Sequence, residues 1–366
     1  MKKSIVALAI AGIFAIPSAM AVEVNGAINI GLDRSKTSGS ATSSDNVSAT
    51  SIETGNTRLS MSHSQDLDNG MVADVFVELH YPLTVANGNI QNRNSTVGLS
   101  GDFGSIRFGT NENAYERMIY AHNYHEGDWK YGPISIMGVA PAGAGNDAQM
   151  RSHIWDRTNN TLIYKGPDGP MAIELDYAFG GSNTTATRTP SLLSMALEYT
   201  MGGGVGLWAG YQVATDWAGN SATPTAARDD SALIFGASFG LGSMGFHVAM
   251  ETMEWKDTTN NVTTERSAWK VEANYPMATG RIGVSYAVAD DSDEDNAGTN
   301  TTTDDGADTL TIGYYHPMGP GVQLFAMYSK TTNDPAGEYN FAIFQAGAGT
   351  AGMDYTNYIF GISVGF

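Results

Sequence analysis

The sequence predicts an all-β protein, a transmembrane antiparallel up-and-down β-barrel of sixteen strands. Apolar and polar residues alternate along many segments, which is the pattern of strands with one apolar face. Short turns alternate strictly with longer polar segments along the chain, as they do in such barrels. No stretch approaches 18 consecutive apolar residues, so the sequence predicts no transmembrane helix.

The chain begins with the pattern of a secretory signal peptide. Two lysines precede an apolar run, and Ala19-Met20-Ala21 supplies the small residues that signal peptidase needs. About a dozen apolar residues is too short to span a bilayer as a helix, and an uncleaved anchor is the alternative. We therefore expect a signal peptide over residues 1–21, cleaved near Ala21, followed by one barrel domain over residues 22–366.

Composition limits the possible function classes. The chain holds no cysteine, which excludes a disulfide scaffold, thiol catalysis and a cysteine-ligated metal. Its formal net charge is −19 at pH 7, so it should repel nucleic acid rather than bind it. The mean hydropathy of −0.19 is typical of a soluble protein, but a membrane barrel also gives such a value because each strand carries only one apolar face.

The alternation is clearest in residues 173–179, 193–199, 269–275 and 282–288. Each segment has an apolar residue at every second position, with charged, polar or small residues between them. A period of two places the two sets on opposite faces of a strand. A soluble β-sandwich shows the same alternation, so this pattern alone does not select a barrel.

The turns and loops favour a barrel over a sandwich. The seven short turns rich in Gly, Asp or Pro cover residues 66–70, 101–104, 166–169, 201–204, 240–243, 276–280 and 317–321. The eight longer polar segments cover residues 33–56, 82–94, 110–156, 180–190, 216–230, 256–265, 290–308 and 330–354. Fifteen connections imply sixteen strands, and this even number places both termini on the periplasmic side. Side chains cannot fill a barrel of this size, so we expect a water-filled lumen.

The end of the chain has the most specific pattern. Alternate residues are apolar and the last one is a phenylalanine, in the series Tyr358, Phe360, Ile362, Val364 and Phe366. This ending resembles the signal that the outer-membrane assembly machinery reads. We therefore expect that machinery as a partner, and the outer membrane of a Gram-negative bacterium as the location.

The stretch from Asn94 to Gly109, which reads NSTVGLSGDFGSIRFG, resembles the paired fourth and fifth strands of the general diffusion porins of Gram-negative bacteria. The segment Val24-Asn25-Gly26 and the terminal Phe are similar as well. The resemblance implies a homotrimer of sixteen-stranded barrels in contact with lipopolysaccharide and outer-membrane lipids. It also implies a passive channel for small hydrophilic solutes and ions, with no enzymatic activity and no cofactor.

The resemblance further implies that the third external loop folds into the lumen and narrows it. The matching segment is Asn111–Asp156, and its acidic residues at the constriction are expected to be Glu112, Glu116, Glu126 and Asp128. The tip motif of the family is absent, and residues 125–129 stand in its place.

The opposite wall of the family carries a ladder of arginines, matched here by Arg58, Arg93 and Arg157. Arg107 alternates with Ile106 and Phe108 and should also face the lumen. Acids facing arginines across a narrow wet gap create a transverse field that favours polar solutes.

We expect moderate cation selectivity. Six further acids should face the lumen, namely Asp74, Glu78, Glu174, Asp176, Glu198 and Glu272. Acids then outnumber bases along the path, and the preference should weaken as salt rises because salt screens the charges.

Three alternatives remain open. One is a substrate-specific porin for sugars or phosphate, although few lysines are available for a phosphate channel. A barrel enzyme would need Ser and His together, and Ser60 or Ser62 with His63 is the nearest set, without an orienting partner. An adhesin would depend on the external loops.

No spacing of His and carboxylates predicts a metal site. The acidic run within residues 290–305 is interpreted as a solvated loop, with divalent-ion bridging to lipopolysaccharide as the alternative.

Overall fold

The computed structural model describes residues 22–39, 48–55, 57–81, 83–84, 89–125, 132–139, 157–180, 190–218, 221–222, 228–339 and 351–366. The expected signal peptide and residues 126–129 of the expected tip of the third loop, which include Glu126 and Asp128, lie outside these residues.

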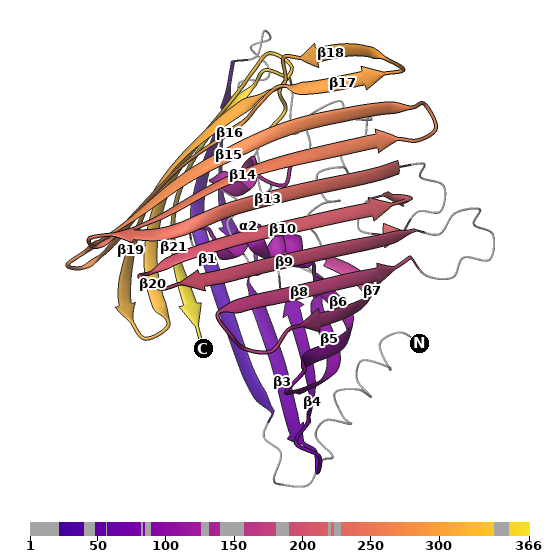
Figure 1. The fold of residues 1–366 in the computed structure, drawn as a ribbon. Coiled ribbons are helices and arrows are strands. Elements are labelled where there is room, and N and C mark those ends of the chain that lie inside the picture. Colours follow the sequence, from indigo (N-terminus) through magenta and orange to yellow (C-terminus); the bar gives the residue numbers. More distant parts are fainter. Residues whose placement is uncertain are drawn as a thin grey trace.

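The chain forms the predicted closed antiparallel barrel of sixteen strands (Figure 1). Its strands are β1 (Glu23–Ser38), β2 (Ser48–Thr54), β3 (Arg58–Asp66), β4 (Val72–His80), β5 (Gln91–Gly101), β6 (Gly104–Glu112), β7 (Arg157–Lys165), β8 (Met171–Phe179), β9 (Ser191–Met201), β10 (Val205–Thr215), β13 (Arg228–Leu241), β14 (Met244–Asp257), β15 (Val262–Met277), β16 (Gly280–Ala289), β19 (Ala307–Gly319), β20 (Val322–Asn333) and β21 (Asp354–Gly365). The segments β2 and β3 are two halves of one strand, because both pair with β1. The barrel closes where β1 pairs with β21, from Ala27 opposite Gly365 to Ser38 opposite Asp354.

All seven predicted short turns join neighbouring strands at one end of the barrel, called here the turn end. Gly104 shows why glycine recurs there. Its φ is +94°, and a Cβ at this position would lie 2.1 Å from the backbone oxygen of Lys165. Only glycine tolerates both the left-handed backbone and the close approach.

The longer connections contain more strand than the sequence predicted. In the segment 256–265, β14 and β15 continue almost to each other, with Asn261 in the left-handed region at φ 53°. In the segment 290–308, β17 (Ser292–Asn296) and β18 (Thr299–Thr303) form a hairpin that extends β15. A further short pair joins β11 (Trp217–Ala218) to β12 (Ser221–Ala222). Threonines and cross-strand hydrogen bonds favour these extensions despite the polar composition.

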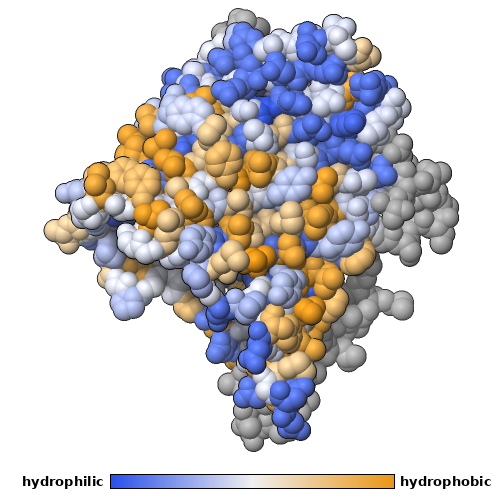
Figure 2. All heavy atoms as spheres, viewed as in Figure 1, coloured by the Kyte–Doolittle hydropathy of each residue, from blue (hydrophilic) through white to orange (hydrophobic). Residues whose placement is uncertain are grey.

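Apolar side chains cover the outside of the barrel, and polar ones line much of its inside. Leu175 and Phe179 are 37% and 52% exposed, whereas Asp176 between them is fully buried. Figure 2 shows hydrophilic residues gathered over β17 and β18, and hydrophobic residues over the strands below them. Strand pairing satisfies the backbone polar groups, which is the condition for lying in a bilayer. Within the described residues, no helix has the length and apolarity needed to cross a membrane.

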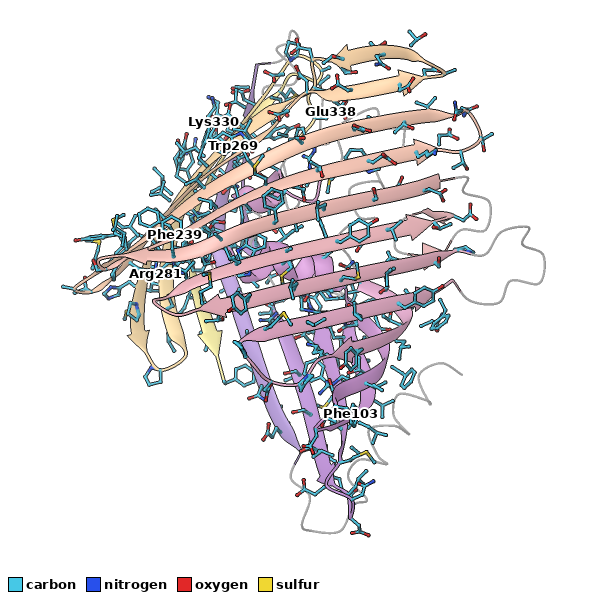
Figure 3. All side chains as sticks on the ribbon, viewed as in Figure 1. Phe103, Phe239, Trp269, Arg281, Lys330 and Glu338 are labelled. Carbon is cyan, nitrogen blue, oxygen red and sulfur yellow. The ribbon has the colours of Figure 1, made fainter. Side chains whose placement is uncertain are left out.

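Aromatic residues of neighbouring strands pack against each other on the outer face of the barrel. Phe239 of β13 stacks on Phe246 of β14 beside a short turn, and Trp269 of β15 packs edge-on against Tyr286 (Figure 3). Trp255, near the end of β14, does not belong to this outer group. It is 1% exposed and belongs to an apolar cluster inside the barrel, because residues 249, 251, 253 and 255 of β14 all point inward.

The connection between β6 and β7, called loop 3 here, folds into the lumen as expected. It contains α2 (Ala114–Ala121) and the short helix η2 (Pro133–Ser135). Asn113 caps α2, since its side chain accepts a 2.8 Å hydrogen bond from the Glu116 amide. Apolar residues of loop 3 pack on the inner faces of strands β9 to β19, including Trp208 and Ile234.

Candidate functional site

Charged residues from six strands and from loop 3 meet on the inner wall. The group is called the inner charge cluster here, and its members are Arg58, Asp74, Glu78, Arg93, Arg107, Glu112, Arg117, Arg157, Lys165, Glu174 and Asp176. Several of these side chains reach water, with Arg58 45% and Lys165 49% exposed.

A break in strand register brings Arg93 into this cluster. Val97 and Leu99 of β5 are exposed on the outer face, so strict alternation would also point Arg93 outward. However, Ser95 lies opposite Val77 and Asn92 lies opposite Leu79, which leaves two residues of β5 against Glu78 alone. This β-bulge turns Arg93 inward.

The carboxylate of Glu78 consequently accepts hydrogen bonds from Arg93 and Asn94 and lies near Arg58. Arg93 donates from Nε to Glu78 Oε1 at 3.0 Å, and Asn94 donates to the same oxygen at 3.3 Å. Arg58 Nε lies 3.8 Å from the other oxygen, Oε2. One carboxylate is therefore shared by two guanidinium groups.

Arg107 reaches across one strand to Asp74, with 3.0 Å between Nη2 and Oδ2. Between them lies Gly98, which pairs with Asp74 on one side and with Arg107 on the other. A Cβ at Gly98 would lie 2.5 Å from Arg107 Cγ. The missing side chain is what lets the arginine lie over β5.

Arg157 of the expected arginine ladder forms an ion pair with Glu112, one of the expected loop 3 acids. Arg157 Nη2 lies 3.2 Å from Glu112 Oε1, and the two residues are register partners on β7 and β6. Glu112 therefore belongs to the wall, not to the freely extended part of loop 3.

Glu116 lies in the first turn of α2 and is 3% exposed. Its side chain is therefore buried, and its carboxylate does not face the water of the lumen. Sequence reasoning missed Arg117, the next residue, which forms ion pairs with Glu174 and Asp176 of β8. Lys165 adds a second base to Glu174 at 3.5 Å. Nothing in the loop sequence distinguished Arg117, because its partners lie on a distant strand.

Loop 3 is seated by hydrogen bonds to the wall. The Tyr115 amide donates to Ser194 Oγ at 2.8 Å, and the Tyr124 amide donates to Glu272 at 2.8 Å. Arg281 donates to the Tyr124 carbonyl at 2.7 Å. The wall thus holds this loop by its backbone.

Two histidines of loop 3 lie within this seat. His125 places Nδ1 2.9 Å from Tyr315 Oη and Nε2 2.8 Å from Ser285 Oγ. Burial lowers the pKa of His125 to about 4. His122 stacks on Trp208, with ring centroids 4.2 Å apart, and burial beside other cationic groups lowers its pKa to about 3. Both rings are neutral near pH 7.

Other expectations have direct geometric outcomes. His63 follows Ser62 on β3, so the two point to opposite faces, and the structure does not bring the Ser and His of the enzyme alternative together.

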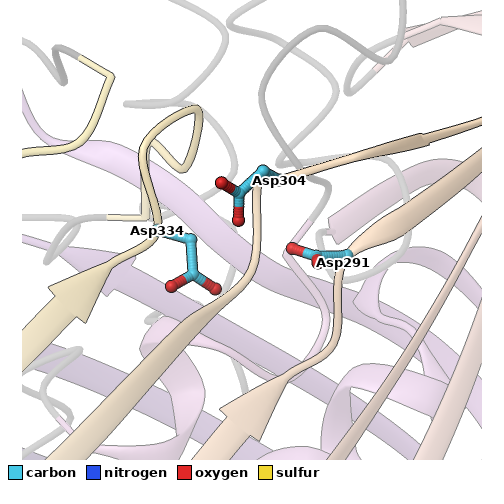
Figure 4. A group of neighbouring side chains, drawn as sticks. All are labelled: Asp291, Asp304 and Asp334. Carbon is cyan, nitrogen blue, oxygen red and sulfur yellow. The ribbon is translucent and has the colours of Figure 1, made fainter.

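Three acids lie together at the end of the barrel opposite the turn end, namely Asp291, Asp304 and Asp334. One carboxylate oxygen of each lies within 4.8 Å of the others (Figure 4). These acids are exposed, and we assign no metal to them.

The residues of the expected assembly signal lie on β21 or directly after it. Tyr358, Phe360 and Phe366 are exposed at 53%, 60% and 61%. Phe366 exchanges two backbone hydrogen bonds with Gly26, and a Cβ at Gly26 would lie 2.5 Å from the Phe366 ring. The final residue therefore fastens the seam where the barrel closes.

Comparison with known proteins decides the family. The sequence profile of the family described as "Gram-negative porin" matches residues 4–336. The chain belongs to the Gram-negative porins. Together with the barrel, this makes it an outer-membrane porin channel.

Solved structures resemble this porin in fold. An anion-selective porin from Comamonas acidovorans is 22% identical, with a TM-score of 0.76 over 95% of this chain and 100% of that chain. The trimer form of OmpT, an outer membrane protein of Vibrio cholerae, is 14% identical, with a TM-score of 0.67 over 95% and 100%. A mutant porin of Rh. blastica is 14% identical, with a TM-score of 0.56 over 94% and 100%. No curated protein matches the sequence of this porin at a significant level.

Proposed function

We propose that this porin is a passive channel for small hydrophilic solutes and ions, with a weak preference for anions at low salt. The observation that carries the proposal is Glu78, whose single carboxylate is shared by Arg58 and Arg93. Among the described residues, the inner charge cluster holds six bases against five acids. Arg58 is the most exposed arginine of the cluster, so its charge acts on passing ions with little compensation.

The expectation of cation selectivity receives no support from this arrangement. It was based on the acids of loop 3 and on six further lumen acids, and five of these six pair with a base: Asp74, Glu78, Glu174, Asp176 and Glu272. A paired acid contributes little net field to the water beside it. The solved porin from Comamonas acidovorans, whose name records anion selectivity, agrees with the proposed sign.

The proposed assembly is a homotrimer in contact with lipopolysaccharide. The trimer form of OmpT supports the trimer, and the broad apolar outer surface supports a lipid or subunit contact. We also propose that residues 1–21 are removed on export and that the terminal strand is read by the assembly machinery.

Liposome swelling tests the passive channel. Vesicles that hold the purified protein should swell in uncharged sugars, at rates that fall smoothly as the sugars become larger. Saturation by one sugar, with exclusion of others of the same size, would favour the substrate-specific alternative. Vesicles that do not swell in any of the sugars would contradict the proposal.

A further inference from the structure

Glu251 of β14 and Arg266 of β15 form a fully buried ion pair on the inner wall. Their side chains are both 0% exposed, and Oε2 lies 2.7 Å from Nη2. Burying two charges is costly unless further hydrogen bonds satisfy them. The identity of those further partners indicates what the pair does.

Glu251 binds both described segments of loop 3, residues 113–125 and 132–139, which are called its first and second arms here. Its Oε1 accepts a 2.6 Å hydrogen bond from the Tyr115 hydroxyl in α2. Both carboxylate oxygens lie 2.9 Å from the Gly138 amide, which follows η2. Burial and the adjacent carboxylate of Glu251 raise the pKa of Tyr115, so its hydroxyl keeps the proton that it donates.

Arg266 extends the connection to a third segment. Its Nη1 donates to the Ile136 carbonyl of loop 3 at 2.9 Å and to the Tyr339 hydroxyl at 3.1 Å. Tyr339 lies in the connection after β20, where the Asn333 side chain holds its amide and its carbonyl at 2.8 Å each. The pair therefore joins α2, the segment around η2 and the connection after β20.

The neighbouring ion pair of Lys270 and Glu272 differs in this respect. Glu272 accepts from the amide of Tyr124, and Lys270 donates to the carbonyl of His122. In the part of the chain that the structure describes, these bonds reach only the first arm of loop 3. Strand pairing already joins β14 to β15 along their length, so neither pair is needed to form the sheet.

We infer that Glu251 and Arg266 are positioning residues that hold both arms of loop 3 in the lumen, and that Tyr339 couples them to the external connection after β20. The inference deepens the proposed function, since it concerns what keeps the channel open at one fixed width. Loss of these bonds frees loop 3 to move and leaves the barrel intact.

Single-channel recording of four proteins tests the inference. Glu251→Gln should replace one steady conductance level by frequent transitions among levels. Arg266→Lys keeps the charge beside Glu251 but loses the fork that reaches Ile136 and Tyr339, so it should also give transitions. Lys330→Met, which removes an ion pair on the outer face, is the matched control and should keep the wild-type level. If Arg266→Lys behaves as wild type, the positioning role is wrong.

A reversible tether separates loop motion from a damaged barrel. A Cβ at Gly210 would lie 3.2 Å from Met118 Cγ, close enough for a disulfide between α2 and β10, and the chain has no cysteine of its own. Met118→Cys with Gly210→Cys, added to Glu251→Gln, should restore the steady level when oxidised and lose it on reduction. Transitions that persist in the oxidised protein would overturn the inference. The proposed function needs only that the wild-type protein conducts steadily, whatever the variants do. The positioning inference and the proposed function can therefore fail separately.

Discussion

The Nε atom of Arg93 lies 3.0 Å from the Oε1 atom of Glu78, and it does so because a β-bulge in β5 turns Arg93 to the inner face. The two side chains are 15% and 10% exposed, so the contact is only partly screened by water. Arg58 approaches the same carboxylate from β3. Loss of the Glu78 carboxylate should therefore change the balance of charge in the inner charge cluster.

Glu78→Gln should increase anion preference. The change removes the acid that two arginines share and keeps the side-chain shape, so the local field becomes more positive. The reversal potential in a potassium chloride gradient should move toward the equilibrium potential of chloride. Glu254→Gln on β14, outside the inner charge cluster, is the matched control and should leave that potential where it is. An unchanged potential in the Glu78 variant would mean that the cluster does not face the ion path.

Gly98→Ala should destabilise the barrel and displace Arg107. The added Cβ would lie 2.5 Å from Arg107 Cγ and 2.7 Å from a backbone oxygen, and such overpacking typically costs about 1–3 kcal/mol. The temperature at which the folded form disappears on a gel should fall. Gly202→Ala meets nothing within 4 Å and should unfold at the wild-type temperature. Equal temperatures for the two variants would contradict the crossing of Arg107 over β5.

Acid should loosen loop 3 between pH 6.5 and about pH 4. His125 has its pKa lowered to about 4 in the seated loop, so the seated state prefers the neutral ring. The stabilisation is complete above the ordinary pKa of 6.5 and is lost as the pH falls toward the folded value. Single-channel current should become unsteady over this range.

His122 should contribute at the acid end of the same range, since its pKa is lowered to about 3. It faces Glu198 of β9, His247 of β14 and Lys270 of β15, whereas Glu272, Arg281 and Lys270 act on His125. His125→Gln with His122→Gln removes both titrating rings and should flatten the response. A double variant with the wild-type acid response would assign that response to other groups.

Removal of Phe366 should reduce the amount of assembled barrel. The residue fastens the seam through two backbone bonds to Gly26, and we propose that the assembly machinery reads it. The heat-modifiable form in the outer membrane is the quantity to measure. Phe103→Ala, which removes another exposed aromatic ring at the turn end, is the control and should assemble normally. Equal amounts of both proteins would leave the terminal residue without this role.

Much of the barrel could be predicted because its signals are local. The alternation in residues 173–179 follows from the period of a strand and is confirmed. Glycine has a positive φ in five of the seven short turns, at Gly70, Gly104, Gly203, Gly242 and Gly321, as backbone sterics require. Residues 256–265 and 290–308 were predicted as irregular loops, whereas both segments contain strand. Polar composition does not reveal strands that continue beyond the apolar belt.

The inner charge cluster was predictable only in part. Arg107 followed from alternation, whereas Arg93 faces inward through a bulge that no alternation rule contains. The partners of Arg117, Glu251 and Arg266 lie far apart in the sequence and meet only when loop 3 folds onto the wall. The pairing of acids with bases, and hence the expected sign of selectivity, depends on such non-local contacts.

The most direct test of the central claim is the reversal potential of the wild-type protein in a planar bilayer separating two dilute potassium chloride solutions. We predict steady ohmic channels with a potential of the sign that weak chloride preference gives, declining toward zero as salt rises. A strong potassium preference would contradict the assignment of the inner charge cluster, and the absence of any conductance would contradict the channel itself.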